Sequence, residues 1–380
     1  MDPVGPSSSA LAPPFGVYVH VPFCASRCDY CAFATWTDRD HLMSSYADAC
    51  RAEIARAITD EAMPPATSVF VGGGTPSRLS GPLLAAVIDA IPRTPGAEVT
   101  VECNPEDATA ALFEAWRSAG VGRVSFGVQS MVPSVLVGLG RHHHPDSVGR
   151  ALALAAAAGI PAVNVDLIFG GASETDDDFR RSLEAVLALE PSPGHVSAYA
   201  LTVEPGTPLA ADPARHPDDD VQARRYLLAD DLLTAAGFTW YEVSNWARPG
   251  QQCRHNRLYW DQGDYRGIGA AAHSHRSGRR WWNIRTPERY IAAVTAGRTT
   301  TAGEEILSDG QRLFERLALA LRTSNGVPSA AVPDDPDLDR LIERRGDRTV
   351  LTVPGRLLAN AVTTRLLLPE TPDPAGILRL

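Results

Sequence analysis

Short apolar segments alternate with helical segments over the first half of the chain, and this alternation constrains the fold more than any other feature. Each apolar segment is an almost unbroken run bounded by Gly, Pro or polar residues, which is typical of strands buried on both faces. Repeated β/α units predict a parallel sheet with right-handed crossovers, although the six expected strands are too few for a complete eight-stranded barrel. The strands are expected at 16–21, 68–71, 98–102, 122–127, 162–168 and 195–201, and the helices at 41–62, 80–91, 109–119, 146–158 and 174–189.

The composition changes beyond residue 245, after a further expected helix at 218–236 and a strand at 239–243. Residues 245–285 are rich in Trp, Tyr, Arg, Gly and His, which predicts a long functional loop region. A small winged-helix-like domain is expected after a boundary near 299–305. Its elements are a helix at 308–321, a second helix near 338–345, a short strand pair around 349–353 and a last helix.

The charge and the hydropathy of the chain argue against several classes of protein. A net charge of −10 is unfavourable for a protein that must neutralise the phosphates of duplex nucleic acid. The sequence lacks an apolar run long enough for a membrane-spanning helix. Residues 1–15 are rich in Pro and Ser without the apolar segment of a signal peptide, which predicts a disordered tail. Six cysteines in 380 residues are too few for a secreted disulfide scaffold, so we expect a reducing, cytoplasmic compartment.

Three of these cysteines, Cys24, Cys28 and Cys31, lie close together directly after the first expected strand. Loops at this edge of a β/α sheet hold the reactive groups of such folds. Three thiolates at C-x3-C-x2-C spacing can bind three irons of a 4Fe-4S cluster and leave the fourth iron open to a substrate or cofactor. Zinc is the alternative, although a structural zinc site usually has a fourth ligand, which this loop does not supply.

The sequence YVHVPFC, which begins at Tyr18, leads into this cysteine motif. Together they resemble radical S-adenosylmethionine (SAM) proteins, and within them the branch that contains oxygen-independent coproporphyrinogen III oxidase and the haem chaperone HemW. The resemblance extends over nearly the whole chain after residue 15, and it implies a 4Fe-4S cluster on the three cysteines together with bound SAM. It also implies an α/β fold with a radical SAM partial (β/α)6 barrel at 16–245, a haem-binding region and linker at 246–305, and a small HemN-like winged-helix domain at 306–380.

Glycines and polar residues fall at the ends of the expected strands. The segment Gly72–Pro76, GGGTP, follows the second strand, where glycines let the backbone approach a ligand closely; a plain tight turn is the alternative. Polar residues also occur at or near the ends of the third, fourth and fifth strands. Because buried carboxylates are costly without a partner, this shared position favours one common pocket. Matched residue by residue, the resemblance implies a SAM site made of Tyr18, Gly73, Gly74, Thr75, Glu102, Gln129, Arg141, Asp166 and Ala200.

Two histidine motifs remain. The run 142–144, His142-His143-His144, cannot direct all three rings at one ion from a regular backbone, so we interpret it as a loop without metal. In HNRLYW, residues 255–260, a histidine could bind haem iron while the aromatic rings pack on the porphyrin. The alternative is an aromatic segment packed on the barrel, with the histidine hydrogen-bonded within it. The motif resembles the haem-binding signature of HemW, which implies a haem site at His255, Asn256, Tyr259 and Trp260, with His273 as a secondary candidate.

Position 33 separates the two branches of the family. The oxidases carry a further cysteine two residues after the cluster motif, whereas this chain has Phe33 there. The resemblance therefore implies a cytoplasmic HemW-like haem chaperone that binds haem, a 4Fe-4S cluster and SAM and delivers haem to haem proteins such as respiratory enzymes. It assigns no catalytic residue, requires an electron donor if radical chemistry is retained, and allows a homodimer. The alternatives are an oxygen-independent coproporphyrinogen III oxidase, which is a radical SAM decarboxylase, and a radical enzyme that modifies RNA.

Overall fold

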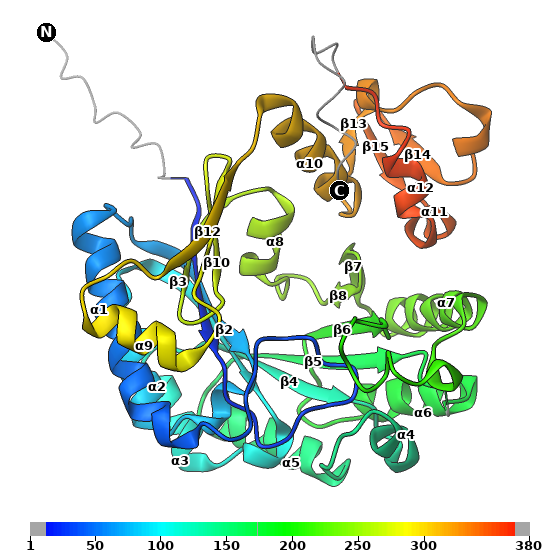
Figure 1. Ribbon diagram of the computed structural model, residues 1–380. Coiled ribbons are helices and arrows are strands. Elements are labelled where there is room, and N and C mark those ends of the chain that lie inside the picture. Colours follow the sequence, from blue (N-terminus) through cyan, green and yellow to red (C-terminus); the bar gives the residue numbers. More distant parts are fainter. Residues whose placement is uncertain (1–12, 173, 369–380) are drawn as a thin grey trace, which may run out of the picture.

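A mixed sheet organises the molecule, which we describe from a computed structural model covering residues 13–172 and 174–368. Its six central strands are parallel neighbours in chain order, and the connecting helices lie along their outer side (Figure 1). The expected partial (β/α)6 fold is confirmed; of the expected tail, residues 1–12 lie outside the described residues. The central strands are β1 Phe15–Val21, β2 Ala66–Gly73, β3 Arg93–Cys103, β4 Arg123–Gln129, β5 Ala162–Phe169 and β6 His195–Ala200.

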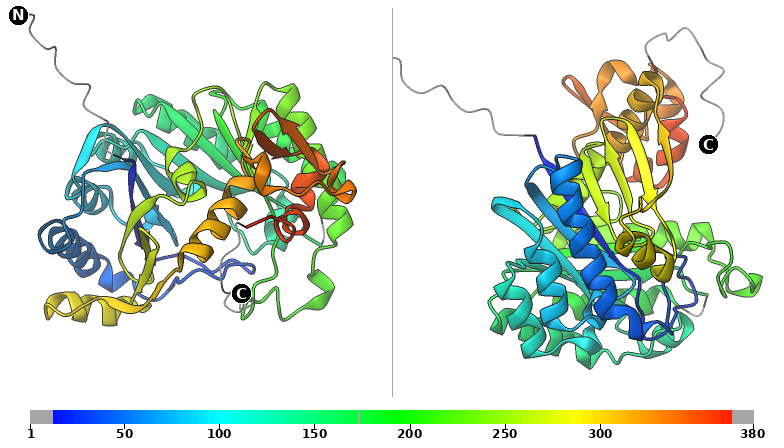
Figure 2. Two further views of the ribbon diagram at one scale, coloured as in Figure 1. Left: turned by 90° about the horizontal axis from the view of Figure 1, so that it is seen from above. Right: turned by 60° about the vertical axis from the view of Figure 1, so that its left-hand side comes forward.

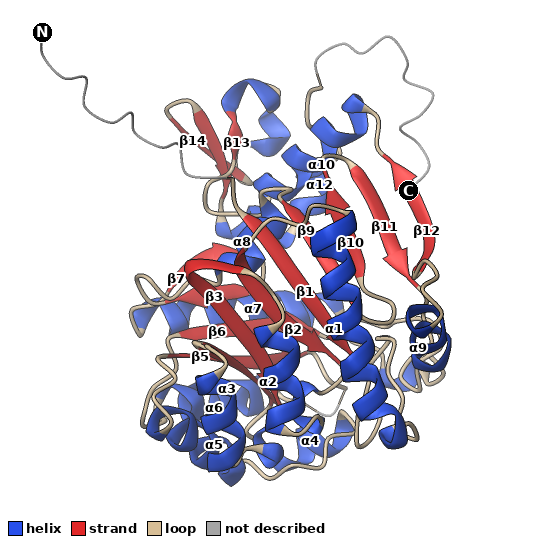
Figure 3. Ribbon diagram, turned by 90° about the vertical axis from the view of Figure 1, so that its left-hand side faces the viewer, coloured by secondary structure: helices blue, strands red, loops and turns tan. Residues whose placement is uncertain are grey.

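The helices between these strands cover the outer face of the sheet (Figures 2 and 3). Their apolar sides form one core with the strands, around large side chains such as Trp116 and Tyr46. A capping box fixes the start of α6, because the Thr175 hydroxyl accepts from the Asp178 amide and the Asp178 carboxylate accepts from the Thr175 amide. The helices are α1 Met43–Asp60, α2 Gly81–Asp89, α3 Ala110–Ser118, α4 Pro133–Gly138, α5 Asp146–Ala157, α6 Asp176–Leu187 and α7 Asp219–Ala235.

The expectation of a long loop at 245–285 is wrong, because this region contributes strands to both sides of the sheet. β9 pairs in parallel with β1, while the β8 and β7 pair continues the sheet beyond β6. These strands lack long apolar runs because they lie toward the sheet margins, where buried side chains such as Trp281 alternate with more exposed ones such as Trp282. The elements are β7 Thr239–Glu242, β8 Asn245–Ala247, α8 Arg254–Trp260, β9 Asp264–Ile268, β10 His273–Arg276, β11 Arg279–Asn283, α9 Pro287–Thr295 and β12 Thr301–Ile306.

A small C-terminal unit packs beside the barrel around its own hydrophobic cluster, which includes Leu321, Leu338 and Val362. The helix expected near 338–345 is wrong: Leu338 ends a short 3-10 turn, and residues 342–345 form β14, which pairs with β15 across a tight hairpin. A three-stranded antiparallel sheet results, so the expected α/β class with a small C-terminal domain holds. None of the described helices is both long and apolar enough to cross a membrane. The elements are α10 Asp309–Leu321, β13 Val327–Pro328, β14 Ile342–Arg345, β15 Arg348–Leu351, α11 Val353–Leu357 and α12 Ala359–Thr363.

Candidate functional site

The loop after β1 presents three thiols to a cavity of about 760 Å³ bounded by the central strands. Cys24, Cys28 and Cys31 are half-buried and form no disulfide. The Thr75 hydroxyl donates to Cys24 Sγ at 3.5 Å, and Arg141 Nη1 donates to Cys28 Sγ at 3.7 Å. Burial raises the pKa of the Cys24 and Cys31 thiols. Bound metal would therefore be needed to hold them as thiolates at neutral pH.

The chemistry of this loop fits a 4Fe-4S cluster bound through separate irons. In the described part of the chain, no three His, Cys, Asp or Glu side chains are gathered as the ligands of a metal ion. A 4Fe-4S cluster does not require the three sulfur atoms to meet at one ion, because each cysteine binds its own iron. The loop offers three free thiols facing one cavity, with a hydroxyl and a guanidinium placed to donate to the sulfur atoms.

The glycine segment after β2 lies against the cysteine loop with no room for side chains. Gly73 has φ +110°, and a Cβ there would lie 2.3 Å from Nδ1 of His20. A Cβ on Gly74 would lie 3.0 Å from Cys24 Sγ. The Gly73 amide donates to the Glu102 carboxylate at 3.1 Å, which joins this segment to β3. Both glycines are therefore required by close approach, and one of them also by its backbone angle.

The structure brings most of the SAM candidates to one place. Tyr18 is the exception: its hydroxyl lies 3.1 Å from His20 Nδ1 and its ring stacks on Phe70 at a centroid distance of 6.5 Å. The others share the cavity with the three cysteines because the parallel strands end at the same edge. The candidates that line the cavity are Gly73, Gly74, Thr75, Glu102, Gln129, Arg141, Asp166 and Ala200.

Two of the carboxyl groups that line this cavity, Glu102 and Asp166, are SAM candidates and lie in different surroundings. Burial, and secondly the charge of Asp166, raises the pKa of Glu102 to about 8. Burial also raises the pKa of Asp166, but hydrogen bonds from Ser125 Oγ and Asn164 Nδ2, both at 2.8 Å, oppose this shift. A cationic or hydroxyl-bearing ligand would stabilise both carboxylates, and SAM carries both kinds of group.

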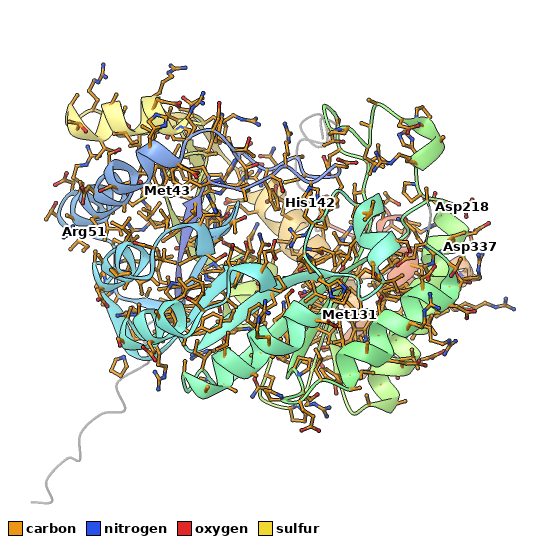
Figure 4. The ribbon with its side chains drawn as sticks, turned by 90° about the horizontal axis from the view of Figure 1, so that it is seen from below. Met43, Arg51, Met131, His142, Asp218 and Asp337 are labelled. Carbon is orange, nitrogen blue, oxygen red and sulfur yellow. The ribbon has the colours of Figure 1, made fainter. Side chains whose placement is uncertain are left out.

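The loop after α4 supplies a guanidinium and the histidine run. Arg141 Nη2 donates to Asn104 Oδ1 and to the Gly127 carbonyl, both at 2.9 Å, which holds the side chain at the cysteine end of the cavity. His142 lines the cavity and lies near the middle of the molecule in the view from below (Figure 4). His143 is buried with neither ring nitrogen hydrogen-bonded, and burial together with Arg141 lowers its pKa to about 4.

The haem candidates lie on α8 and point in different directions. His255 is completely buried: Nδ1 lies 2.9 Å from Ser68 Oγ, and Nε2 lies 2.9 Å from the Tyr259 hydroxyl. Burial lowers the pKa of His255 to about 3, so the ring is neutral. Asn256 lines the main cavity, whereas Trp260 lines a separate cavity of about 260 Å³ beside the C-terminal unit. The structure therefore does not gather these side chains around one open space.

The secondary candidate His273 lies apart from α8. It begins β10, and its ring stacks on Trp282 at a centroid distance of 5.7 Å.

Phe33 is 64% exposed and lines the main cavity beside the cysteine loop. The residue at which the sequence resemblance separates the oxidases from the chaperones therefore lies beside the three cysteines.

Sequence reasoning missed the residues at the opposite end of the cavity. These residues precede the strand ends, whereas the prediction from sequence rested on polar residues at or near those ends. Alternation along β4 was the available signal, since Arg123 and Ser125 share a strand face with Gly127 and Gln129. The missed residues include Thr100, Arg123, Ser125, Asn164, His195 and Ser197.

Comparisons with known proteins agree with this geometry. Residues 18–186 match the radical SAM superfamily. The haem chaperone HemW of Mycobacterium tuberculosis is 44% identical over 373 residues, which cover 93% of this chain and 95% of that protein. HemW of Escherichia coli is 38% identical, covering 69% of this chain and 70% of that protein, and HemW of Bacillus subtilis is 31% identical, covering 82% and 84%.

A solved structure shares the fold over nearly the whole chain. Coproporphyrinogen III oxidase (HemN) from Escherichia coli, described as a radical SAM enzyme, superposes with a TM-score of 0.80. The alignment covers 93% of this chain and 89% of that one, at 20% identity. At this level of identity the similarity establishes the fold and leaves the activity to other evidence.

Proposed function

This chain belongs to the HemW-like family of radical SAM proteins, and we propose that it acts as a haem chaperone. The observation that carries the proposal is the 44% identity, over 93% of the chain, with a protein named as a haem chaperone. Membership of the radical SAM superfamily implies a 4Fe-4S cluster and SAM. In the proposal, the protein binds haem in the cytoplasm and passes it to haem proteins such as respiratory enzymes.

We propose that Cys24, Cys28 and Cys31 hold the cluster. When bound, a cluster of this kind supplies the electron that cleaves SAM to a carbon radical. Thr75 and Arg141 donate hydrogen bonds to the cysteine sulfurs, which would stabilise their thiolate form. The surrounding strands would shield a reactive ligand from bulk water.

The remaining cavity residues would orient SAM. The carboxyl groups of Glu102 and Asp166 would accept from its ammonium and hydroxyl groups, and the glycine backbone would lie directly against it. Gln129, Ala200 and the hydrogen-bonded Tyr18 complete the proposed set. No catalytic residue is proposed.

Haem binding through His255 would require a change at α8. Both ring nitrogens are occupied, so Nε2 must leave the Tyr259 hydroxyl before it can bind iron. The neutral ring is already in the protonation state that binds metal. We propose that displacement of α8 presents His255 to haem, with Asn256 and the rings of Tyr259 and Trp260 forming the rest of the site.

Haem titration followed by the Soret absorbance tests this arrangement. His255→Ala should weaken haem binding at least tenfold. Tyr259→Phe keeps the ring but frees Nε2, so it should tighten binding about fivefold, the equivalent of one hydrogen bond of about 1 kcal/mol. His216→Ala, at an exposed histidine outside both cavities, is the control. Unchanged affinity in a folded His255→Ala protein would contradict the ligand assignment.

An oxygen-independent coproporphyrinogen III oxidase is the second candidate. The cavity of about 760 Å³ beside the cysteine loop favours it, because a decarboxylase needs space for a substrate next to SAM. Phe33, in place of the further cysteine of the oxidases, opposes it. Anaerobic incubation of the reduced protein with coproporphyrinogen III decides between them: formation of protoporphyrinogen IX with stoichiometric 5′-deoxyadenosine would replace the chaperone proposal.

We further propose that the residues after 305 form a separate domain, because their buried side chains make a distinct hydrophobic cluster. The preceding residues 246–305, expected as a haem-binding region and linker, carry α8 and the marginal strands. The expected linker at 299–305 largely coincides with β12, which pairs with β11. A link through a paired strand would restrict the motion of the small domain more than a flexible linker would.

A further inference from the structure

We propose that the floor of the main cavity is an anion-binding subsite, centred on Arg123, that takes the carboxylate of a second ligand beside SAM. The floor is defined by Thr100, Arg123, His195 and Asn256, which line the cavity away from Cys24, Cys28 and Cys31. Arg123 begins β4 and the SAM candidate Gln129 ends it, so at about 3.3 Å per residue they lie about 20 Å apart along the strand. The inference rests on the proposed function only in taking this cavity as the place where SAM binds.

Arg123 is a buried cation with unused hydrogen-bonding capacity. Its exposed fraction is 3%, and Nη1 donates to the Gln251 carbonyl at 2.9 Å. Nη2 is buried without a hydrogen-bond partner, and within residues 13–172 and 174–368 the guanidinium forms no salt bridge. Burial raises the pKa of Asp166 and the charge of Arg123 opposes this shift, but the guanidinium forms no salt bridge with this carboxyl group. Burial of a charge without a salt-bridge partner is costly, so such a group in a cavity wall indicates a place for a negatively charged ligand.

The neighbours of Arg123 add neutral donors to the floor. Thr100 is its register partner on β3, is fully buried, and has a hydroxyl without a hydrogen-bond partner. The Asn256 amide enters the same cavity from α8. His195 brings no charge: its Nδ1 lies 2.6 Å from Asn164 Oδ1, and burial lowers its pKa well below its usual range. The floor therefore combines one permanent cation with neutral groups that can donate.

The charge of the cavity selects a carboxylate over a dianion. A carboxylate accepts two parallel N–H groups from a guanidinium and carries a single charge. A phosphate dianion would meet stronger repulsion from the carboxylate of Asp166, which lines the same cavity. The carboxylate has two sources by this chemistry: a propionate of a tetrapyrrole such as haem, or a separate small carboxylic acid.

Equilibrium titrations of the cluster-reconstituted protein with SAM present distinguish these sources. The probes are haem, haem dimethyl ester, which lacks free carboxylates, and glutarate. Arg123→Met should weaken binding of haem or of glutarate by at least about tenfold, as expected for loss of a buried charge partner. Arg123→Lys should restore part of the lost affinity. Thr100→Val, which preserves side-chain size, should lower the affinity about threefold.

Arg248→Met is the matched control, because Arg248 also forms no salt bridge among the described residues but packs on Phe238 outside the cavity. It should change neither affinity. An effect of Arg123→Met on haem but not on its dimethyl ester identifies the propionate, and an effect on glutarate alone identifies a separate acid.

Several outcomes would overturn the proposal. One is unchanged binding of both haem and glutarate in an Arg123→Met protein that still holds its cluster. Another is an equal loss of SAM affinity in that variant, which would assign Arg123 to the SAM site. A wild-type protein that binds neither probe would also refute the subsite. Wild-type binding of glutarate without haem would instead refute the chaperone proposal and leave the subsite intact.

Discussion

Single residues set how closely the glycine segment can approach the cysteine loop. Gly73→Ala would place a methyl group against His20 at a backbone angle of φ +110°. We expect this variant to lose at least about 3 kcal/mol of unfolding free energy and to bind SAM weakly. Gly96→Ala is the control, because Gly96 also has a positive φ, +72°, but its Cβ would meet nothing within 4 Å. Its cost should be about 1 kcal/mol in urea denaturation. Equal costs for the two variants would show that the contact with His20 is unimportant.

The carboxyl group of Glu102 should make the stability of the SAM-free protein depend on pH. Its pKa is about 8 in the folded protein against 4.5 for an unperturbed group, so the folded state binds the proton more tightly. Stability from this group is therefore full below about pH 4.5 and falls as the pH rises toward 8. We expect a loss of roughly 2 kcal/mol over this range, smaller than the full shift because the cavity admits water.

Glu102→Gln tests this effect, because the amide is neutral at all pH values and should flatten the dependence. Thermal unfolding of both proteins between pH 5 and pH 8, without SAM, is the measurement. A steeper fall in the variant than in the wild type would contradict the assignment.

The sequence marks candidate residues that belong to a motif and does not mark those whose position depends on enclosure. Spacing marks Cys24 and the glycine run marks Gly73, and both line the main cavity. Arg123 and Thr100 were missed because a polar residue at the start or in the interior of a strand looks the same in sequence whether it faces solvent or a cavity. Which of the two it faces depends on the curvature of the sheet in the folded protein.

At the scale of elements, α8 is held by a carboxylate from another part of the chain. Its N-cap residue, Cys253, provides no side-chain cap, and Glu98 on β3 accepts instead from the amides of Arg254 at 3.2 Å and His255 at 3.1 Å. This carboxylate also interacts favourably with the helix N-terminus.

Glu98→Gln should therefore destabilise the folded position of α8 by about 1 kcal/mol. Amide hydrogen exchange within residues 254–260 should become faster, and haem should associate faster if α8 must move to admit it. Glu114→Gln, at an exposed position on α3, should change neither rate. Unaltered exchange in Glu98→Gln would mean that other contacts hold the helix.

Strands that are buried on both faces were predictable from sequence, whereas strands near the edges of the sheet were not. The run 162–168 is apolar enough that β5 follows from composition. By contrast, β10 and β11 consist of His, Arg, Trp, Ser and Asn, which form no apolar run. They form strands because each pairs with a neighbour already in the sheet, and a local sequence window does not contain that neighbour.

At the scale of the molecule, the side chain of Arg356 adds to the backbone hydrogen bonds that join the C-terminal unit to the barrel. The Arg356 guanidinium, on α11, lies 3.8 Å from the ring centroid of Trp240, and its Nη1 lies 2.9 Å from Asp230 Oδ1. Both contacts are partly buried and reach across from the C-terminal unit to β7 and α7.

Arg356→Met should weaken this attachment by about 2 kcal/mol. In urea denaturation followed by tryptophan fluorescence, the C-terminal unit should then unfold in a separate step before the barrel. Arg345→Met removes only an exposed ion pair with Glu343 and should leave the urea profile unchanged. A single cooperative transition with an unshifted midpoint in Arg356→Met would show that this arginine does not fasten the unit.

The seven-residue helix α8 has a consequence beyond its own packing. Through His255 it contacts the start of β2, through Asn256 the floor of the main cavity, and through Trp260 the cavity beside the C-terminal unit. A ligand that moves this helix at any one of these three places changes the free energy of the contacts that the helix makes at the other two. By thermodynamic reciprocity, occupancy of the main cavity and exposure of His255 would then influence each other by the same free energy.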